Sequence, residues 1–151
     1  MMGWQKKVSL IAQLPNNRVL ISRHRSYGNI WSATLEKSIP NIHSFTALDI
    51  VNGWLSSMFG IDPTNYCDDY VHIKRESDIE FENMTVLPYT AKFKSNLVLS
   101  VPSFYDFSTM DVEEYLEYKN LNNVTYNINH IKQFSMCSVV TLVELKKRNT
   151  L

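Results

Sequence analysis

The sequence predicts an α+β domain in which a mixed β-sheet is flanked by helices, as an α/β/α sandwich. Several β-prone apolar segments are separated by turn residues, an apolar stripe of helical period lies between residues 40 and 60, and a second helical pattern lies near the carboxyl-terminal end. The chain has 151 residues, 44% of them hydrophobic, which is enough for one core. Residues 1–151 are therefore expected to form a single domain, without the regular strand–helix alternation of a doubly wound nucleotide fold.

The first elements form a predicted β-hairpin. Lys7 to Leu14 is β-prone and mostly apolar, Pro15 to Asn17 is a turn, and Arg18 to His24 is the returning strand. A break at residues 26–29 precedes a third short strand, from Ile30 to Leu35.

An amphipathic helix is predicted between Pro40 and Gly60, with Ser44 or Thr46 as its cap and Gly60 as its stop. Its apolar stripe consists of Ala47, Leu48, Val51, Leu55, Met58 and Phe59. Gly53, in the helix interior, costs about 1 kcal/mol relative to alanine. Either a neighbour packs closely against this glycine or it is a tolerated weakness.

The remaining elements follow from composition. Further strands are predicted at residues 66–74, 81–94 and 96–101, and a hydroxyl cap followed by acidic residues predicts a short helix at 108–118. After an asparagine-rich loop at 120–129, the pattern at 128–148 predicts a final helix, with a strand through Ser138 to Thr141 as the alternative.

Composition bears on location and partners. No run of about 18 apolar residues exists, and the first seven residues lack a secretory signal, so a cytoplasmic protein without a membrane partner is expected. Cys67 and Cys137 are interpreted as reduced core thiols. The low glycine content and abundant asparagine and tyrosine are consistent with a viral or AT-rich source.

The charged residues are unevenly distributed although the formal net charge is zero. Five basic residues precede the first acidic one, Glu36, whereas the charged residues within 62–82 are mainly acidic. This polarity either attracts an anionic ligand or supports contact between subunits, or it reflects two solvated faces. The neutral total gives no strong nucleic-acid signal.

The order of elements resembles that of the Nudix hydrolases. In that family the pattern G-x5-E-x7-R-E-U-x-E-E-x-G-U, with U aliphatic, binds a divalent metal and positions it on a diphosphate. Gly60 and Ile61 match its last two positions, while the strand Val19 to Arg23 and Trp31 are similar to the family's second strand and to the tryptophan before its Pro-Gly-Gly turn. The resemblance spans residues 7–62 and implies a Nudix-like fold.

The metal ligands of the pattern are not retained. Counting back from Gly60 without gaps, the motif's first glutamate falls on Phe45, its Arg-Glu pair on Gly53 and Trp54, and its later glutamates on Ser57 and Met58. Thr34-Leu35-Glu36 replaces the Pro-Gly-Gly turn. Magnesium needs hard oxygen ligands, which serine and methionine do not replace. The resemblance therefore implies a degenerate motif without metal or cofactor.

The leading hypothesis is a catalytically inactive, Nudix-like binding protein that acts through a protein partner or a nucleotide-type ligand. Arg23 and Arg25 offer positive charge, and Trp31 offers a stacking surface for a phosphorylated base. The alternative interpretation of these residues is an exposed strand end beside a core tryptophan. Exposed aromatics form a homodimer contact or complete the core: Tyr105, Phe107, Tyr115 and Tyr118.

The alternative hypothesis is a divergent hydrolase with relocated carboxylates. Glu36, expected in the turn before the long helix, and Asp49, on that helix, are its candidate catalytic residues, with Mg²⁺ as cofactor. Such an enzyme would cleave a nucleoside diphosphate derivative. The missing motif glutamates favour the non-enzymatic hypothesis.

Overall fold

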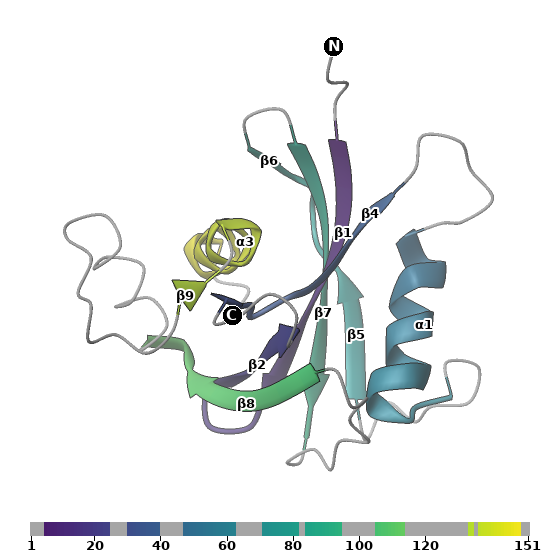
Figure 1. Ribbon diagram of the computed structural model, residues 1–151. Coiled ribbons are helices and arrows are strands. Elements are labelled where there is room, and N and C mark those ends of the chain that lie inside the picture. Colours follow the sequence, from purple (N-terminus) through teal and green to yellow (C-terminus); the bar gives the residue numbers. More distant parts are fainter. Residues whose placement is uncertain are drawn as a thin grey trace.

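The computed structural model places a mixed β-sheet between two helices (Figure 1). The structure describes residues 5–24, 30–39, 47–62, 71–81, 84–94, 105–113, 133–134 and 136–148. Within these residues the main sheet has seven strands, and the predicted α+β sandwich is confirmed. Neither described helix is long and apolar enough to cross a membrane.

The sheet is organised around β1 (Gln5–Leu14). Along one edge β1 pairs in parallel with β7 (Met84–Phe93). Its other edge is shared by two antiparallel neighbours, because β2 (Arg18–His24) pairs at Gln13 and Leu14 and β4 (Leu35–Ile39) pairs along Lys6 to Leu10. The sheet therefore divides into two branches at β1.

The outer strands pair with β7 and with β2. β5 (Val71–Arg75) and β6 (Ile79–Phe81) pair antiparallel with β7, and β8 (Tyr105–Asp111) pairs antiparallel with β2. Two short parallel strands, β3 (Ile30–Trp31) and β9 (Gln133–Phe134), form a separate pair.

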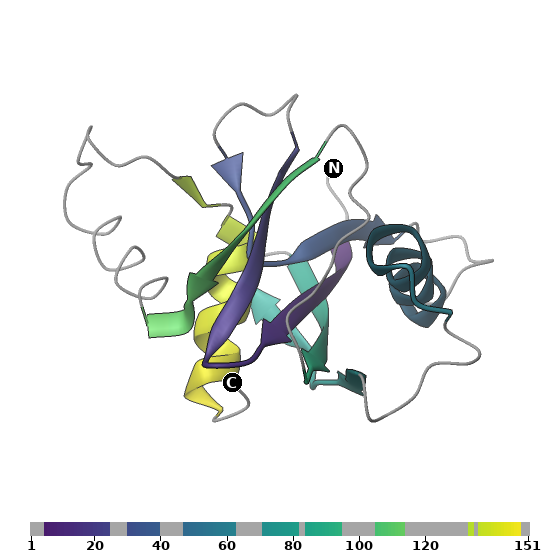
Figure 2. The same cartoon turned by 90° about the horizontal axis from the view of Figure 1, so that it is seen from below.

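The two helices cover opposite faces of the sheet: α1 (Ala47–Phe59) lies on one side and α3 (Met136–Lys147) on the other (Figures 1 and 2). The α1-side core contains Val8, Leu10, Ala12, Leu14, Leu20, Leu35, Val51, Leu55, Met58, Phe59, Ile61, Val71, Tyr89, Ala91 and Phe93. The α3-side core contains Ile11, Val19, Ile21, Trp31, Ala33, Ile79, Val86, Met110, Val112, Leu142 and Leu145. Alternate residues of β1, β2 and β7 thus supply both cores.

The predicted hairpin is confirmed, and its turn uses the asparagines. Asn16 and Asn17 have φ angles of 65° and 60°, in the left-handed region that asparagine tolerates better than most residues. The carbonyl oxygen of Asn17 accepts a hydrogen bond of 3.0 Å from the backbone N–H of Val112, which ties the turn to the end of β8.

The predicted amphipathic helix is confirmed as α1. Gly60 ends it with a φ of 64°, the left-handed conformation that glycine favours after a helix, and the N–H of Ile61 donates a 2.8 Å hydrogen bond back to the carbonyl of Leu55. Leu48, however, is 49% exposed and does not belong to the buried stripe. Of the two interpretations of Gly53, close packing is wrong: apart from its chain neighbours and the backbone of its own helix, no heavy atom of the described residues lies within 4 Å of the position its Cβ would occupy. The predicted caps, Ser44 and Thr46, lie outside the described residues.

The predicted third strand is interrupted. β3 ends at Trp31, Ser32 forms an isolated bridge with Ser22 through two hydrogen bonds of 2.8 Å, and β4 begins at Leu35. Glu36 was expected in a turn but lies in β4, opposite Ser9 of β1. Pairing with a strand some 27 residues earlier overrides the local turn signal.

The helix predicted at 108–118 is wrong over its first residues. Ser108 to Asp111 continue β8 because they pair with β2, from Arg18 to Ile21. The helical signal takes effect only after the strand: the Asp111 carboxylate accepts a 2.9 Å hydrogen bond from the N–H of Glu113, which is the geometry of an N-cap. Residues 114–118 lie outside the described part of the chain.

The other expectations have mixed outcomes. β5 and β7 confirm strands predicted within 66–74 and 81–94, whereas the segments 96–101 and 120–129 lie outside the described residues. The final helix is confirmed but begins at Met136, after β9, rather than at 128. Among the aromatics, Phe107 packs against the α1-side core, while the side chain of Tyr105 and both later tyrosines are outside the described part.

Candidate functional site

A groove of about 460 Å³ lies between α1 and β4. It is lined by Lys37, Ser38, Asp49, Ile50, Gly53, Trp54 and Ser57. Its volume falls within the range of small-molecule sites, roughly 300–1,000 Å³. Because the walls come from one helix and one strand of the central sheet, regular backbone positions both sides of the groove.

The period of α1 explains where the groove lies. The stripe that faces the sheet is buried, whereas Ile50 and Trp54 are partly buried at its flank and Gly53 and Ser57 are exposed beside them. Residues three and four apart are neighbours on a helix, so these four positions form one continuous wall.

Neither Gly53 nor Ser57 places a large side chain in the groove. Gly53 has no side chain, and no other element of the described chain comes within 4 Å of the position its Cβ would occupy. The Ser57 hydroxyl donates a 2.8 Å hydrogen bond to the Gly53 carbonyl, which turns the hydroxyl back along the helix. The groove is therefore open in front of the Trp54 indole.

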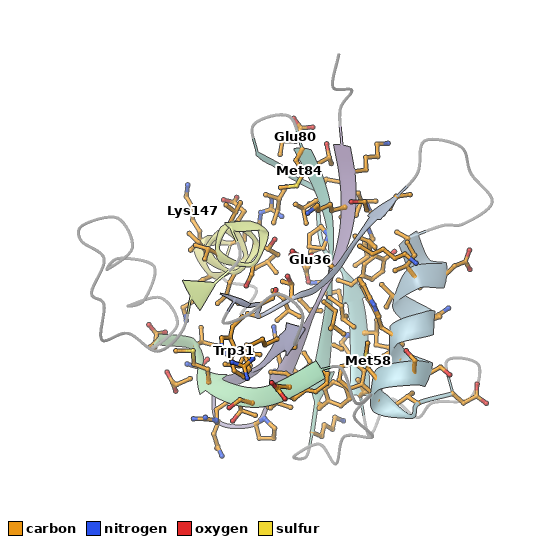
Figure 3. The ribbon with its side chains drawn as sticks, in the orientation of Figure 1. Trp31, Glu36, Met58, Glu80, Met84 and Lys147 are labelled. Carbon is orange, nitrogen blue, oxygen red and sulfur yellow. The ribbon has the colours of Figure 1, made fainter. Side chains whose placement is uncertain are left out.

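The groove lies where the motif count places metal ligands. Gly53, Trp54 and Ser57 line it, and Met58 is 7% exposed within the α1-side core (Figure 3). Asp49 is the one carboxylate among the lining residues. The described residues contain no cluster of three or more His, Cys, Asp or Glu side chains able to hold a metal ion.

Glu36 and Asp49 lie on opposite faces of the sheet. Leu35 and Ile39 of β4 pack with the α1-side core, so the alternation of the strand turns Glu36 toward the α3 side (Figure 3). There its Oε2 accepts a 2.9 Å hydrogen bond from the Thr34 hydroxyl. Asp49 lines the groove on the α1 side. The sheet separates the two carboxylates, which in this arrangement do not share a metal ion.

Arg23 and Trp31 are brought together, but away from the groove. The Arg23 guanidinium lies over the Trp31 ring, 4.9 Å from its centroid, and its Nη2 donates a hydrogen bond to Oδ2 of Asp106 at 2.6 Å. Trp31 is 7% exposed and belongs to the α3-side core. Arg25 lies outside the described residues, so the ligand role of Arg23, Arg25 and Trp31 stays a prediction.

Sequence reasoning missed Lys37 and Ile50 as lining residues. Lys37 could not be placed because the strand was expected to end at Leu35, before it. Ile50 lies one turn before Trp54, so the helical period together with the motif count was the available signal. No pattern local to β4 indicates that this strand faces α1.

Solved structures similar to this chain show the same fold. Protein DR0079 of Deinococcus radiodurans superposes with a TM-score of 0.68 at 7% identity, covering 95% of this chain and 84% of that one. The E. coli dihydroneopterin triphosphate pyrophosphohydrolase gives a TM-score of 0.66 at 10% identity and covers 97% and 99%. The NUDIX domain of Shewanella oneidensis NrtR, complexed with ADP-ribose, gives 0.63 at 11% identity and covers 99% and 91%.

Comparisons by sequence find no counterpart: no protein-family model and no curated protein matches the chain. The structural likeness extends over nearly the whole chain despite identities of 7 to 11%. It confirms the predicted Nudix-like fold.

Proposed function

We propose that this chain, which has a Nudix-like fold, binds a nucleotide-type ligand in the groove between α1 and β4 and does not hydrolyse it. The observation that carries the proposal is the groove itself. It is open along the helix that bears the motif in Nudix hydrolases, but Gly53, Trp54 and Ser57 replace an arginine and two glutamates there.

The lining of the groove supports binding. Trp54 and Ile50 offer apolar surface, and Lys37 offers a positive charge for a phosphate. The NrtR NUDIX domain, a structural neighbour, is complexed with ADP-ribose. ADP-ribose is therefore the first ligand to test.

The same lining argues against hydrolysis. Metal-assisted attack on a diphosphate requires several oxygen ligands around the ion. The groove contributes the single carboxylate of Asp49, and Glu36 lies on the other face of the sheet. A lone surface carboxylate holds Mg²⁺ too weakly to position it on a substrate.

Isothermal titration calorimetry with ADP-ribose and a panel of nucleoside di- and triphosphates tests the proposal. The wild-type chain is expected to bind at least one of them, and the same ligands are expected to stay intact with Mg²⁺ or Mn²⁺ at high protein concentration. Gly53→Leu fills the groove and should abolish binding. Ser56→Leu, an exposed position of the same helix outside the lining, is the matched control and should leave binding unchanged.

Two results would contradict the proposal. If no member of the panel binds, the chain does not bind a nucleotide-type ligand. Metal-dependent phosphate release that is lost in Asp49→Asn or Glu36→Gln establishes the divergent hydrolase instead.

A protein partner is the second candidate function. Leu48 is the one large hydrophobic side chain recorded as exposed among the described residues, and it lies in the first turn of α1. A second copy of the chain is the partner to test first, by analytical ultracentrifugation. A homodimer that becomes monomeric in Leu48→Glu supports this function, and a wild-type monomer at all concentrations contradicts the homodimer.

A further inference from the structure

We propose that the groove holds the aromatic base of its ligand against Trp54 and the phosphate against Lys37, and that no metal ion is needed. The inference rests on the proposed function and assigns the two ends of the ligand to two walls of the same site. It places a ring at the helix positions where the motif would hold a metal ion.

Trp54 provides a fixed surface for a planar ring. The indole packs partly against the α1-side core while it also lines the groove. A ring held in this way loses little conformational freedom when a base stacks on it. Ile50, one turn earlier on the helix, continues the apolar surface.

Gly53 gives a base access to that ring. Apart from its chain neighbours and the backbone of its own helix, no heavy atom of the described residues lies within 4 Å of the position of a Cβ at this residue, and the residue is exposed. Any larger side chain here would project into the space beside Trp54. The glycine thus leaves room for a flat group instead of contributing a contact of its own.

Lys37 provides the charge on the opposite wall. It lies between Leu35 and Ile39 on β4, and the alternation of the strand turns all three toward α1. Among the described residues, no carboxylate lies within salt-bridge distance of its ammonium group. A lysine ammonium is a compact point charge that binds phosphate without fixed geometry.

With Trp54 and Lys37 in these places, ligand binding needs no metal ion. Lys37 is the one lysine among the lining residues, and its ammonium group supplies the positive charge that a metal ion would otherwise bring to the phosphate. Binding should therefore persist in a chelator.

Calorimetry with adenosine, ADP and ADP-ribose in EDTA tests the assignment, with Trp54→Ala and Lys37→Ala as the variants. Trp54→Ala should weaken all three ligands by a similar factor, about tenfold, because each contains the stacked base. Lys37→Ala should weaken ADP and ADP-ribose by about five- to tenfold and change adenosine less than about twofold. Trp54→Phe and Lys37→Arg should retain most of the affinity.

The controls separate binding from folding. Lys92→Ala removes an exposed lysine that does not line the groove and should leave all three affinities unchanged. Thermal melting of every variant checks that it folds. If Trp54→Ala does not fold, Trp54→Leu keeps an apolar side chain without the aromatic face and replaces it in the test.

Distinct outcomes overturn the two proposals. If the wild-type chain binds neither these three ligands nor any member of the nucleoside di- and triphosphate panel, the proposed function fails. If the wild-type chain binds and Gly53→Leu blocks binding, but Trp54→Ala and Lys37→Ala bind normally, the proposed function stands and this assignment is wrong. Loss of wild-type binding in EDTA, or an equal effect of Lys37→Ala on adenosine and ADP, also overturns the assignment.

Discussion

The two helices that cover the sheet bury side chains of different polarity. α1 presents only apolar side chains to the sheet: Val51, Leu55, Met58 and Phe59. α3 buries Leu142 and Leu145 together with the hydroxyls of Ser138 and Thr141. The hydrophobic effect, which has no preferred direction, holds α1 on the sheet. α3 is held by hydrophobic burial and also by hydrogen bonds, which require a specific geometry.

The attachment of α3 occurs at both ends. Near its start, the Ser138 hydroxyl oxygen accepts a 2.7 Å hydrogen bond from the N–H of Ala33. After its end, the Arg148 guanidinium donates to the carbonyl oxygens of Ser77 and Asp78, at 2.8 and 3.2 Å. Hydrogen bonds therefore hold both ends of α3 against the sheet, whereas the outer flank of α1 stays open as one wall of the groove.

Core truncations on the two faces of the sheet should cause the greatest loss in the free energy of unfolding, and they test whether both faces belong to one cooperative core. Leu55→Ala on α1 and Leu142→Ala on α3 each remove a fully buried side chain, 0% exposed. Each should lower the free energy of unfolding by about 2–5 kcal/mol, through lost transfer energy and a residual cavity. Urea denaturation measures both, with exposed Leu48→Ala as the control, expected within about 0.5 kcal/mol. A loss under about 1 kcal/mol at either site would mean that this face does not contribute to the cooperative core.

The next effect tests the directional attachment of α3. Ser138→Ala leaves the buried N–H of Ala33 without the 2.7 Å acceptor and should cost about 1–3 kcal/mol. The measurement is the shift of the urea midpoint at unchanged slope. Restoration of stability by Ser138→Thr, which keeps the hydroxyl, is the expected control. A neutral Ser138→Ala would show that the hydrogen bond does not hold α3 in place.

The glycines of the α1 segment should respond with opposite signs. Gly60→Ala forces alanine into a φ of 64° and should destabilise by about 1–2 kcal/mol. The Cβ of Gly53→Ala meets no neighbouring element of the described chain within 4 Å, so this change should stabilise the helix by about 0.5–1 kcal/mol. Thermal melting of the two variants side by side checks the prediction. Equal signs would contradict either the cap at Gly60 or the open space at Gly53.

Removing the two buried hydroxyls of α3 should change the free energy of unfolding differently, and Thr141 gives the least change of the series. The Thr141 hydroxyl is buried and has no hydrogen-bond partner among the described residues, unlike that of Ser138. Thr141→Val should therefore be neutral or stabilise by up to about 1 kcal/mol, because it removes an uncompensated desolvation cost. The same urea titration tests it, and a loss as large as that of Ser138→Ala would mean that Thr141 has a polar partner.

The contrast between the helices also explains which elements were predictable. α1 has an apolar stripe of clear helical period and a glycine stop, so its existence and its end follow from local sequence. α3 buries polar and apolar residues on the same face, so its pattern is weaker and its start was placed eight residues early. The hairpin was predictable because its turn residues lie next to both strands.

The site was predictable only in part. The motif count identified Gly53, Trp54 and Ser57 as the positions without metal ligands, and all three line the groove. The opposite wall depends on β4, whose pairing with β1 joins residues far apart in the chain. Lys37 therefore had no local signal.

Local sequence was enough to predict the hairpin, the amphipathic helix with its Gly60 stop and the loss of the motif carboxylates, because each depends on residues close together in the chain. Long-range contacts, in contrast, make Ser108 to Asp111 a strand, since their pairing with β2 outweighs a local helical preference. They also place Glu36 and Asp49 on opposite faces of the sheet and Lys37 across a groove from Trp54. Those arrangements depend on strand register and on the side of the sheet that each helix covers, which long-range packing sets.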